Sequence, residues 1–269
     1  MSDTKNSILD YFPTLHNTEE YFTRITNEDG ATGRILKQYL MLILFAFLYG
    51  AVMGGYHSAL QAVVAGGKVA VLFTLALIIC FPALFIIQFI LGSRLRLLQM
   101  VSIILSGFVL TSAIMVSFSP IVIIFLLTGS NYYFLQLLHI LIFVLSGAFG
   151  MKTVVDALKF SCEKKSVYPQ TGVVVFRFWV VILAFVAIQL AWNLRPFLGD
   201  RGQPFALFRA YEGNFYTALI YSARQLLDDI DQPPQTYSPS SGMYRLDDGT
   251  AADTTLQSFE RDYLGGDTL

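Results

Sequence analysis

The feature that most constrains this chain is a set of five long apolar stretches, which lie at about 38–55, 68–91, 98–118, 132–155 and 173–193. The hydrocarbon core of a bilayer is about 30 Å thick, so a helix needs about 20 apolar residues to cross it. Charged residues make up only 14% of the chain, against about 25% in an ordinary soluble protein. They gather at the two ends and in short loops between the stretches. The pattern predicts an all-α, polytopic membrane protein with five transmembrane helices.

Two prolines interrupt these stretches. Pro82 lies inside the second stretch, where a proline kinks a helix because it lacks an N–H and its ring meets the preceding turn. Pro120 lies in "FSPIVIIFLL", which follows the third stretch and is too short to cross the membrane again. We expect this segment either to extend the third helix past Pro120 or to be re-entrant.

The basic residues of the loops predict the orientation, because cytoplasmic loops carry an excess of lysine and arginine. Nine basic residues lie on the side of the N-terminus: Arg34, Lys37, Arg94, Arg96, Lys152, Lys159, Lys164, Lys165 and Arg177. Four lie on the other side: Lys68, Arg195, Arg201 and Arg209. Of these, Lys68 is assigned to the first loop. The N-terminus is therefore predicted to be cytoplasmic, and the C-terminus periplasmic or extracellular.

The chain divides into four predicted regions. Residues 1–36 form a cytoplasmic N-terminal arm with a short helix at 17–25, and residues 37–194 form the five-helix transmembrane domain. Residues 195–230 form an external interfacial turn and an amphipathic helix. Residues 231–269 are rich in Pro, Ser, Thr, Gly and Asp, and such a composition buries too little apolar surface to fold alone. This tail is predicted to be disordered or bound to a partner.

The segment "AWNLRPFLGDRGQPFALFR" follows the last apolar stretch and carries interface residues. Trp192 belongs to the aromatic belt, Pro196 ends the span, and Arg195 can reach a phosphate headgroup or the carbonyl end of a neighbouring helix. Asn193 adds a polar side chain beside them. Phe205 and Phe208 then return to the interface, so the segment folds back over the bundle. It forms either a docking platform for a partner or a lid that seals the bundle.

An amphipathic helix is predicted after this segment, with Asn214 as its N-cap. Its apolar face repeats at spacings of three and four through Phe215, Leu219, Ala223, Leu226 and Ile230. The opposite face holds Ser222, Gln225, Asp228 and Asp229. A helix made to lie on anionic lipid is rich in lysine and arginine, whereas this helix has only Arg224. Its apolar face is therefore expected to pack on protein.

Small residues at four-residue spacing predict close helix packing. Gly50 and Gly54 form such a pair in the first span, and Ser146 and Gly150 form one in the fourth. Ser102 and Ser106 repeat the spacing in the third span. These faces serve tight packing inside the bundle or, alternatively, a dimer interface.

Polar side chains inside a membrane are candidates for function. His139 lies in the fourth span, where it either relays protons or binds a ligand, or is a neutral hydrogen-bonding residue between helices. Lys152 and Asp156 are four residues apart and are expected to pair. The remaining polar side chains either line a groove or hold helices together: Gln88, Gln99, Gln189 and Asn193.

The motifs of the common catalytic sites are not found in the sequence, including HExxH, GxSxG and the phosphate loop. We expect no enzyme activity, no cofactor and no metal site, and the net charge of −1 does not suggest nucleic acid. The first hypothesis is a non-catalytic accessory or scaffold subunit of a membrane complex. It would contact the lipid bilayer and a protein partner, or form a homo-oligomer. The alternative is a small transporter or channel for ions or lipid, which would use Pro82, Pro120 and His139.

Several quoted stretches resemble one family: "FLYGAVMGGY", "KVAVLFTLALIICFPALF", "FILGSRLRLLQ", "SFSPIVIIFLL", "SGAFG" and the block "AWNLRPFLG…PFALFR…EGNFY". Together they cover roughly residues 30–222 and are similar to an uncharacterised family of five-span bacterial inner-membrane proteins, distantly Yip1-like. The resemblance implies five spans and a location in the bacterial inner (cytoplasmic) membrane, and it implies no activity.

Overall fold

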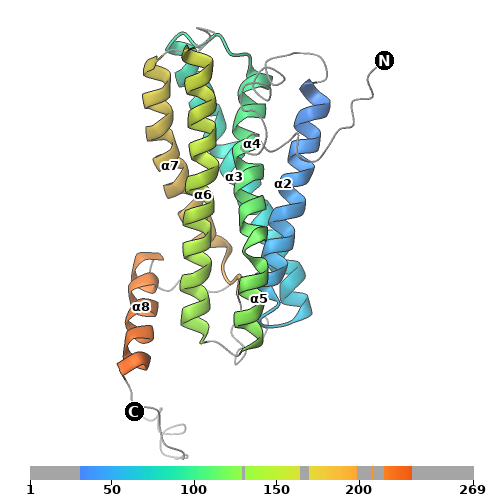
Figure 1. Cartoon of the computed structure of the whole chain (residues 1–269), viewed down its shortest axis with the longest axis vertical. Helices are drawn as coiled ribbons and strands as arrows, with labels where there is room; N and C mark the ends of the chain where they lie inside the picture. The colour runs from blue at the N-terminus through green and yellow to red at the C-terminus, as the bar shows by residue number, and fades with distance from the viewer. Residues whose placement is uncertain (1–30, 129–130, 164–169, 199–206, 209–214, 232–269) are drawn as a thin grey trace, which may run out of the picture. The chain divides into compact units, whose positions relative to one another are not determined.

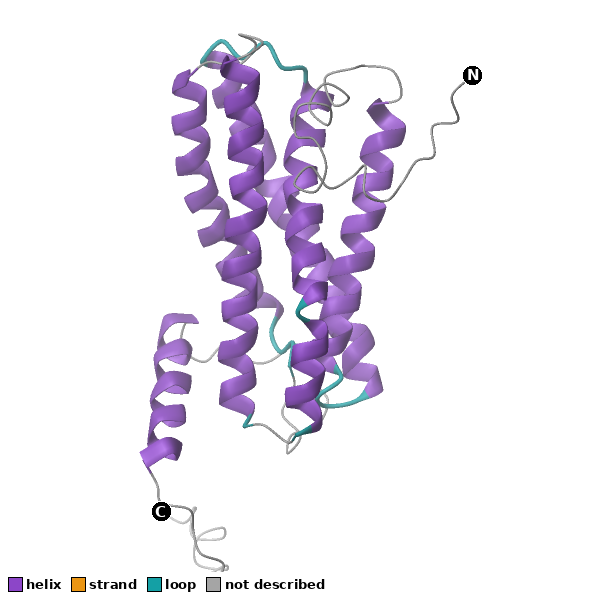
Figure 2. Ribbon diagram, in the orientation of Figure 1, coloured by secondary structure: helices purple, strands orange, loops and turns teal. Residues whose placement is uncertain are grey.

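The structure is a computed structural model that describes residues 31–128, 131–163, 170–198, 207–208 and 215–231. The described part consists of helices and loops and contains no strand (Figure 2). The chain divides into two units, Met1–Ile230 and Asp231–Leu269, and the helices described below belong to the first unit. The predicted helix at 17–25 and the tail from residue 232 lie outside the described residues.

Seven helices make up the described part of the chain: α2 (Ala31–Gly54), α3 (Ala59–Ile90), α4 (Leu97–Ser117), α5 (Ser119–Leu127), α6 (Tyr132–Glu163), α7 (Gln170–Leu194) and α8 (Phe215–Asp231). Five of the resulting segments are long and apolar enough to cross a membrane, with α4 and α5 counted together as one. The predicted fold class, an all-α protein with five spans, is confirmed.

The third span continues past Pro120. Only Phe118 separates α4 from α5, and its backbone is α-helical. The Phe118 amide donates to the carbonyl of Ile114 at 3.2 Å, and the Val122 amide donates to the carbonyl of Phe118 at 3.1 Å. Pro120 lies in the first turn of α5, where its missing N–H costs little. Of the two alternatives for this segment, the structure has the extended helix.

The second span begins earlier than predicted. The hydroxyl of Ser58 accepts a hydrogen bond from the amide of Gln61 at 3.2 Å and thereby caps the N-terminus of α3. The assignment of Lys68 to the first loop was therefore wrong, because Lys68 lies in the third turn of α3. Gly66 and Gly67 lower the local hydropathy, so the start of this helix could not be recognised from apolar length.

Helix α2 packs against α3 and α4, α4 packs against α6, and α3 packs against α7 (Figure 1). Glycines permit the closest of these approaches. A Cβ atom on Gly50 would lie 2.6 Å from the carbonyl oxygen of Ala65, and one on Gly54 would lie 2.7 Å from the Cβ of Ala65. The face formed by Gly50 and Gly54 is therefore occupied by α3 of the same chain.

The α4–α6 contact is equally close. A Cβ atom on Gly150 would lie 2.6 Å from the carbonyl oxygen of Gly107 and would collide with the hydroxyl of Thr111. Ser146, one turn before Gly150, is fully buried. The predicted small-residue pairs thus lie at helix contacts within this bundle.

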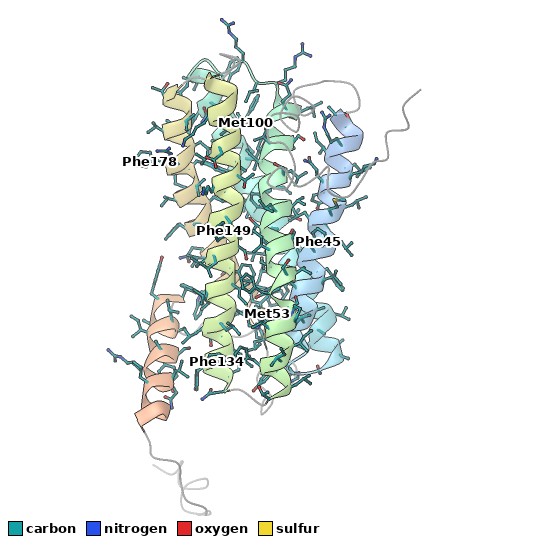
Figure 3. All side chains as sticks on the ribbon, in the orientation of Figure 1. Phe45, Met53, Met100, Phe134, Phe149 and Phe178 are labelled. Carbon is teal, nitrogen blue, oxygen red and sulfur yellow. The ribbon has the colours of Figure 1, made fainter. Side chains whose placement is uncertain are left out.

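Interhelical hydrogen bonds accompany the close packing. The hydroxyl of Ser102 on α4 donates to Oε1 of Gln38 on α2 at 2.9 Å. On the other side of the bundle, Nε2 of Gln88 on α3 donates to the carbonyl of Gly172 on α7 at 2.9 Å. Large apolar side chains such as Phe178 point away from the bundle, as expected of a lipid-facing surface (Figure 3).

Candidate functional site

The segment that follows α7 begins with a stacked pair. The guanidinium carbon of Arg195 lies 3.6 Å from the ring centroid of Trp192, one turn before it. Arginine stacks favourably on an indole face through its planar guanidinium. The Arg195–Pro196 peptide bond is cis, and α7 ends at Leu194. The stacking was not predicted, although the pair was assigned to the membrane interface.

Lys68 holds this segment against α3. Its ammonium donates to the carbonyl oxygen of Pro196 at 3.0 Å and also to the carbonyl oxygen of Leu207. The Nζ atom lies 5.0 Å from the ring centroid of Phe208 and 6.0 Å from that of Phe197. The side chain is 6% exposed. A nearly buried cation is thus balanced by backbone carbonyls and aromatic faces, the kind of partners that desolvated ammonium groups require.

Gln61 supports the same segment two turns earlier on α3. Its Nε2 atom donates to the carbonyls of Pro196 and Phe197 at 3.2 and 3.3 Å. A backbone segment without regular structure needs partners for its carbonyls wherever it is buried. Gln61 and Lys68 supply them from one face of one helix, because they are seven residues apart. We call residues 195–198 and 207–208, together with Gln61 and Lys68, the seam.

Phe215, Tyr221 and Ser222 attach helix α8 to the same end of the bundle. The ring of Phe215 lies 6.4 Å from that of Trp192 on α7, and the ring of Tyr221 lies 5.8 Å from that of Tyr133 at the start of α6. The hydroxyl of Ser222 donates to the carbonyl of Ala218 at 2.9 Å and lies 3.4 Å from Oε1 of Gln136. Ser222 was predicted on the polar face of this helix, opposite the apolar one. The structure buries it, because α8 meets the bundle through its polar edge as well.

The opposite side of α8 carries uncovered apolar side chains. Tyr216, Ile220 and Leu227 are 48%, 54% and 61% exposed. Their spacing of four and seven residues places them along one face of the helix, which we call the α8 stripe. The predicted apolar residues Leu219 and Leu226 are half-buried between this stripe and the bundle.

A second group of polar side chains lies inside the bundle. The hydroxyl of Tyr49 on α2 is 2.8 Å from Nδ1 of His139 on α6, and their rings meet edge to face. Nε2 of His139 is buried and has no hydrogen-bond partner, and the same is true of the hydroxyls of Ser119 and Ser146. The interhelical hydrogen bond of His139 is present, and its predicted functional role stays a prediction.

The remaining predicted site residues are not gathered at one place. Asn193 donates to the carbonyl of Gln189 within α7, and Gln99 accepts from the amide of Arg96 at the start of α4. The expected Lys152–Asp156 pair was wrong: Asp156 lies 4.0 Å from Lys159, one turn along. Phe205 and Asn214 lie outside the described residues.

Sequence reasoning missed Lys68, Gln61 and Tyr49 as parts of these sites. One signal was available for Lys68, because it is a cation next to an apolar stretch of membrane length. Gln61 and Tyr49 have no local signal, since their partners lie 135 and 90 residues away.

The fold and the two polar sites define a five-span helical membrane protein whose last described helix follows the spans. Comparison with protein-family models, curated proteins and solved structures finds no match for this chain. Among the described residues, no group of three or more His, Cys, Asp or Glu side chains is arranged to hold a metal ion.

Proposed function

We propose that the chain is a non-catalytic integral membrane subunit that serves as an accessory or scaffold component of a bacterial inner-membrane complex. Its contact surface is the external C-terminal segment, with the seam as its base and the α8 stripe as its face. The observation that carries the proposal is the hold of Lys68 and Gln61 on residues 195–198 and 207–208. A segment that served only as a spacer would not need four backbone carbonyl contacts from a buried lysine and a buried glutamine.

The α8 stripe supports a protein partner rather than a lipid surface. Helices that lie on anionic membranes present lysine and arginine beside their apolar face. The described polar positions of α8 include Arg224, and the sequence continues with Asp228 and Asp229. A contiguous apolar face of Tyr216, Ile220 and Leu227 on such a helix is typical of a protein contact.

The test is affinity purification of the tagged full-length chain from its native membrane, with a photo-crosslinking residue at Ile220. We expect Ile220 to crosslink to a second membrane protein, and the change Ile220→Asn to abolish its co-purification. The change Gln225→Asn, five residues along and about 140° around the helix from Ile220, is the matched control and should retain the partner. Crosslinks to lipid alone, to a second copy alone, or an equal yield of partner with both variants would refute the proposal.

A second candidate function, a small transporter or channel for ions or lipid, is favoured by one observation. His139 is buried in the bundle with Nε2 unpartnered, which is uncommon for a purely structural histidine. Flux through proteoliposomes that is lost on changing His139 to Leu would support this function, and equal flux in the two proteins would exclude a role for His139.

A further inference from the structure

The hydrogen bond between Tyr49 and His139 fixes the tautomer of the imidazole. The Tyr49 hydroxyl lies 2.8 Å from Nδ1, and the two side chains are 0% and 3% exposed. If Nδ1 carried the proton, it would donate to Tyr49, and both the phenolic O–H and the Nε2 lone pair would lack partners. If Tyr49 donates to Nδ1, only the N–H at Nε2 lacks one. Because buried polar groups are almost always paired, the second arrangement is preferred.

A second unpartnered group lies at the same level of the bundle. The rings of Phe125 on α5 and Phe134 on α6 are 4.9 Å apart and set the register of these two consecutive helices. Ser119 precedes Phe125 by six residues and His139 follows Phe134 by five, which corresponds to about 9 and about 7.5 Å along the helix axes. The Ser119 hydroxyl and Nε2 of His139 are thus within about one turn of the same level, and neither has a partner.

Both groups face one apolar cluster. Met115 and Val122, one turn on either side of Ser119, belong to the cluster that also holds Tyr49. Leu135 and Ile142, one turn on either side of His139, belong to it as well. Among the described residues, Lys68 is the one buried side chain with a full charge, and its ammonium is held by the carbonyls of Pro196 and Leu207. An ion at His139 would therefore find no buried counter-charge.

We propose that His139, Tyr49 and Ser119 form an intramembrane binding site for one neutral oxygen ligand of the size of a water molecule. The ligand oxygen accepts a hydrogen bond from Nε2–H of His139 and exchanges a second one with the Ser119 hydroxyl. Tyr49 orients the imidazole so that this N–H faces the ligand. A water molecule fits the site, since it accepts and donates at once and buried waters typically join two or more such groups.

The site is formed by residues of three spans. It lies at the level where the third span of the chain passes from α4 to α5. Tyr49 comes from α2, Ser119 is the first residue of α5, and His139 comes from α6. Phe118, which separates α4 from α5, directly precedes Ser119. The proposal is independent of the scaffold function, because the seam and the α8 stripe involve none of these three residues.

The test uses the full-length chain in lipid nanodiscs, with ¹⁵N-labelled imidazoles and magic-angle-spinning NMR. The chain has three histidines. With the changes His16→Gln and His57→Gln, the imidazole signal that remains is that of His139. We expect a neutral ring protonated at Nε2, and transfer of magnetisation from water to that proton. Ser119→Ala should lose most of this transfer. The matched control Ser117→Ala should keep it, because the Ser117 hydroxyl is exposed and donates to the carbonyl of Ala113.

The spectrum of the His16→Gln, His57→Gln protein alone can overturn the proposal, whatever the serine variants do. A ring protonated at Nδ1, or an Nε2 proton that receives no magnetisation from water, excludes the site. Equal transfer in the folded Ser119→Ala and Ser117→Ala proteins excludes the part assigned to Ser119. Size-exclusion profiles that match the wild type establish that both variants are folded.

Discussion

Lys68 in the third turn of α3 donates a hydrogen bond to the carbonyl oxygen of Pro196 at 3.0 Å, although 128 residues separate the two along the chain. The contact joins the second span to the segment that follows the fifth. The carbonyl of Leu207 is held by the same ammonium. One side chain therefore fixes two points of a segment that has no regular secondary structure between α7 and α8 in its described residues.

Lys68→Met should release this segment without unfolding the bundle. A hydrogen bond to a charged group contributes about 1.5–3 kcal/mol, and Met keeps the length and apolar stem of the side chain. Local opening near Phe197 and Phe208 should become about 10-fold to 100-fold more frequent. Hydrogen–deuterium exchange of the backbone amides of residues 197–198 and 207–208 measures the frequency of this local opening.

Lys37→Met is the control for this change, because Lys37 is exposed on α2. It should leave exchange in the seam unchanged. If the two variants exchange alike, Lys68 does not hold the segment.

Gly150→Ala should destabilise the contact between α4 and α6. The new Cβ would lie 2.6 Å from the Gly107 carbonyl and would meet the Thr111 hydroxyl, and such overpacking costs about 1–3 kcal/mol. Gly147→Ala, three residues earlier on the same helix, has nothing within 4 Å of its Cβ and should keep or slightly raise stability, because Ala is a better helix former than Gly. Unfolding by titration with SDS measures both, and equal midpoints would contradict the packing described for α6.

The number of spans was predictable because apolar length is a local property. Each crossing must satisfy its backbone within its own helix, so the fourth and fifth stretches and their spans agree closely in position. The start of α3 was not predictable from apolar length, since Gly66, Gly67 and Lys68 lower the hydropathy there. Its signal is instead the cap at Ser58.

The seam was predictable only in part. Trp192, Arg195 and Pro196 were assigned to the interface from residue type alone, which indicates a place and not a partner. Lys68 and Gln61 enter through tertiary contacts with a segment more than 120 residues away. The ion pair of Asp156 shows the same limit on a smaller scale: Lys152 and Lys159 both lie within reach of it on a helix, and only the structure selects Lys159.

Trp179→Phe should weaken the attachment of α7 to α3. The indole Nε1–H donates to the carbonyl of Cys80 at 2.9 Å, close to Pro82. The bond therefore joins the indole of α7 to the backbone of α3, two residues before Pro82. Loss of one buried hydrogen bond should lower the free energy of unfolding by about 1 kcal/mol.

The change Phe178→Leu is the matched control for Trp179→Phe, because Phe178 points away from the bundle (Figure 3). It should change stability little. Thermal unfolding in one detergent compares the two proteins, and an equal loss in both would indicate that the Cys80 carbonyl does not need the indole.

The orientation predicted from the basic residues places the two ends of the chain on opposite sides of the membrane. With five spans, an N-terminus in the cytoplasm requires a C-terminus outside. In a background with Cys80 and Cys162 changed to Ser, a cysteine at Thr268 should react with a membrane-impermeant thiol reagent in intact cells. A cysteine at Thr32, exposed at the start of α2, should react only after the cells are opened. The reverse pattern would invert the topology, and it would move the seam and the α8 stripe to the cytoplasmic side, where a partner would have to be sought instead.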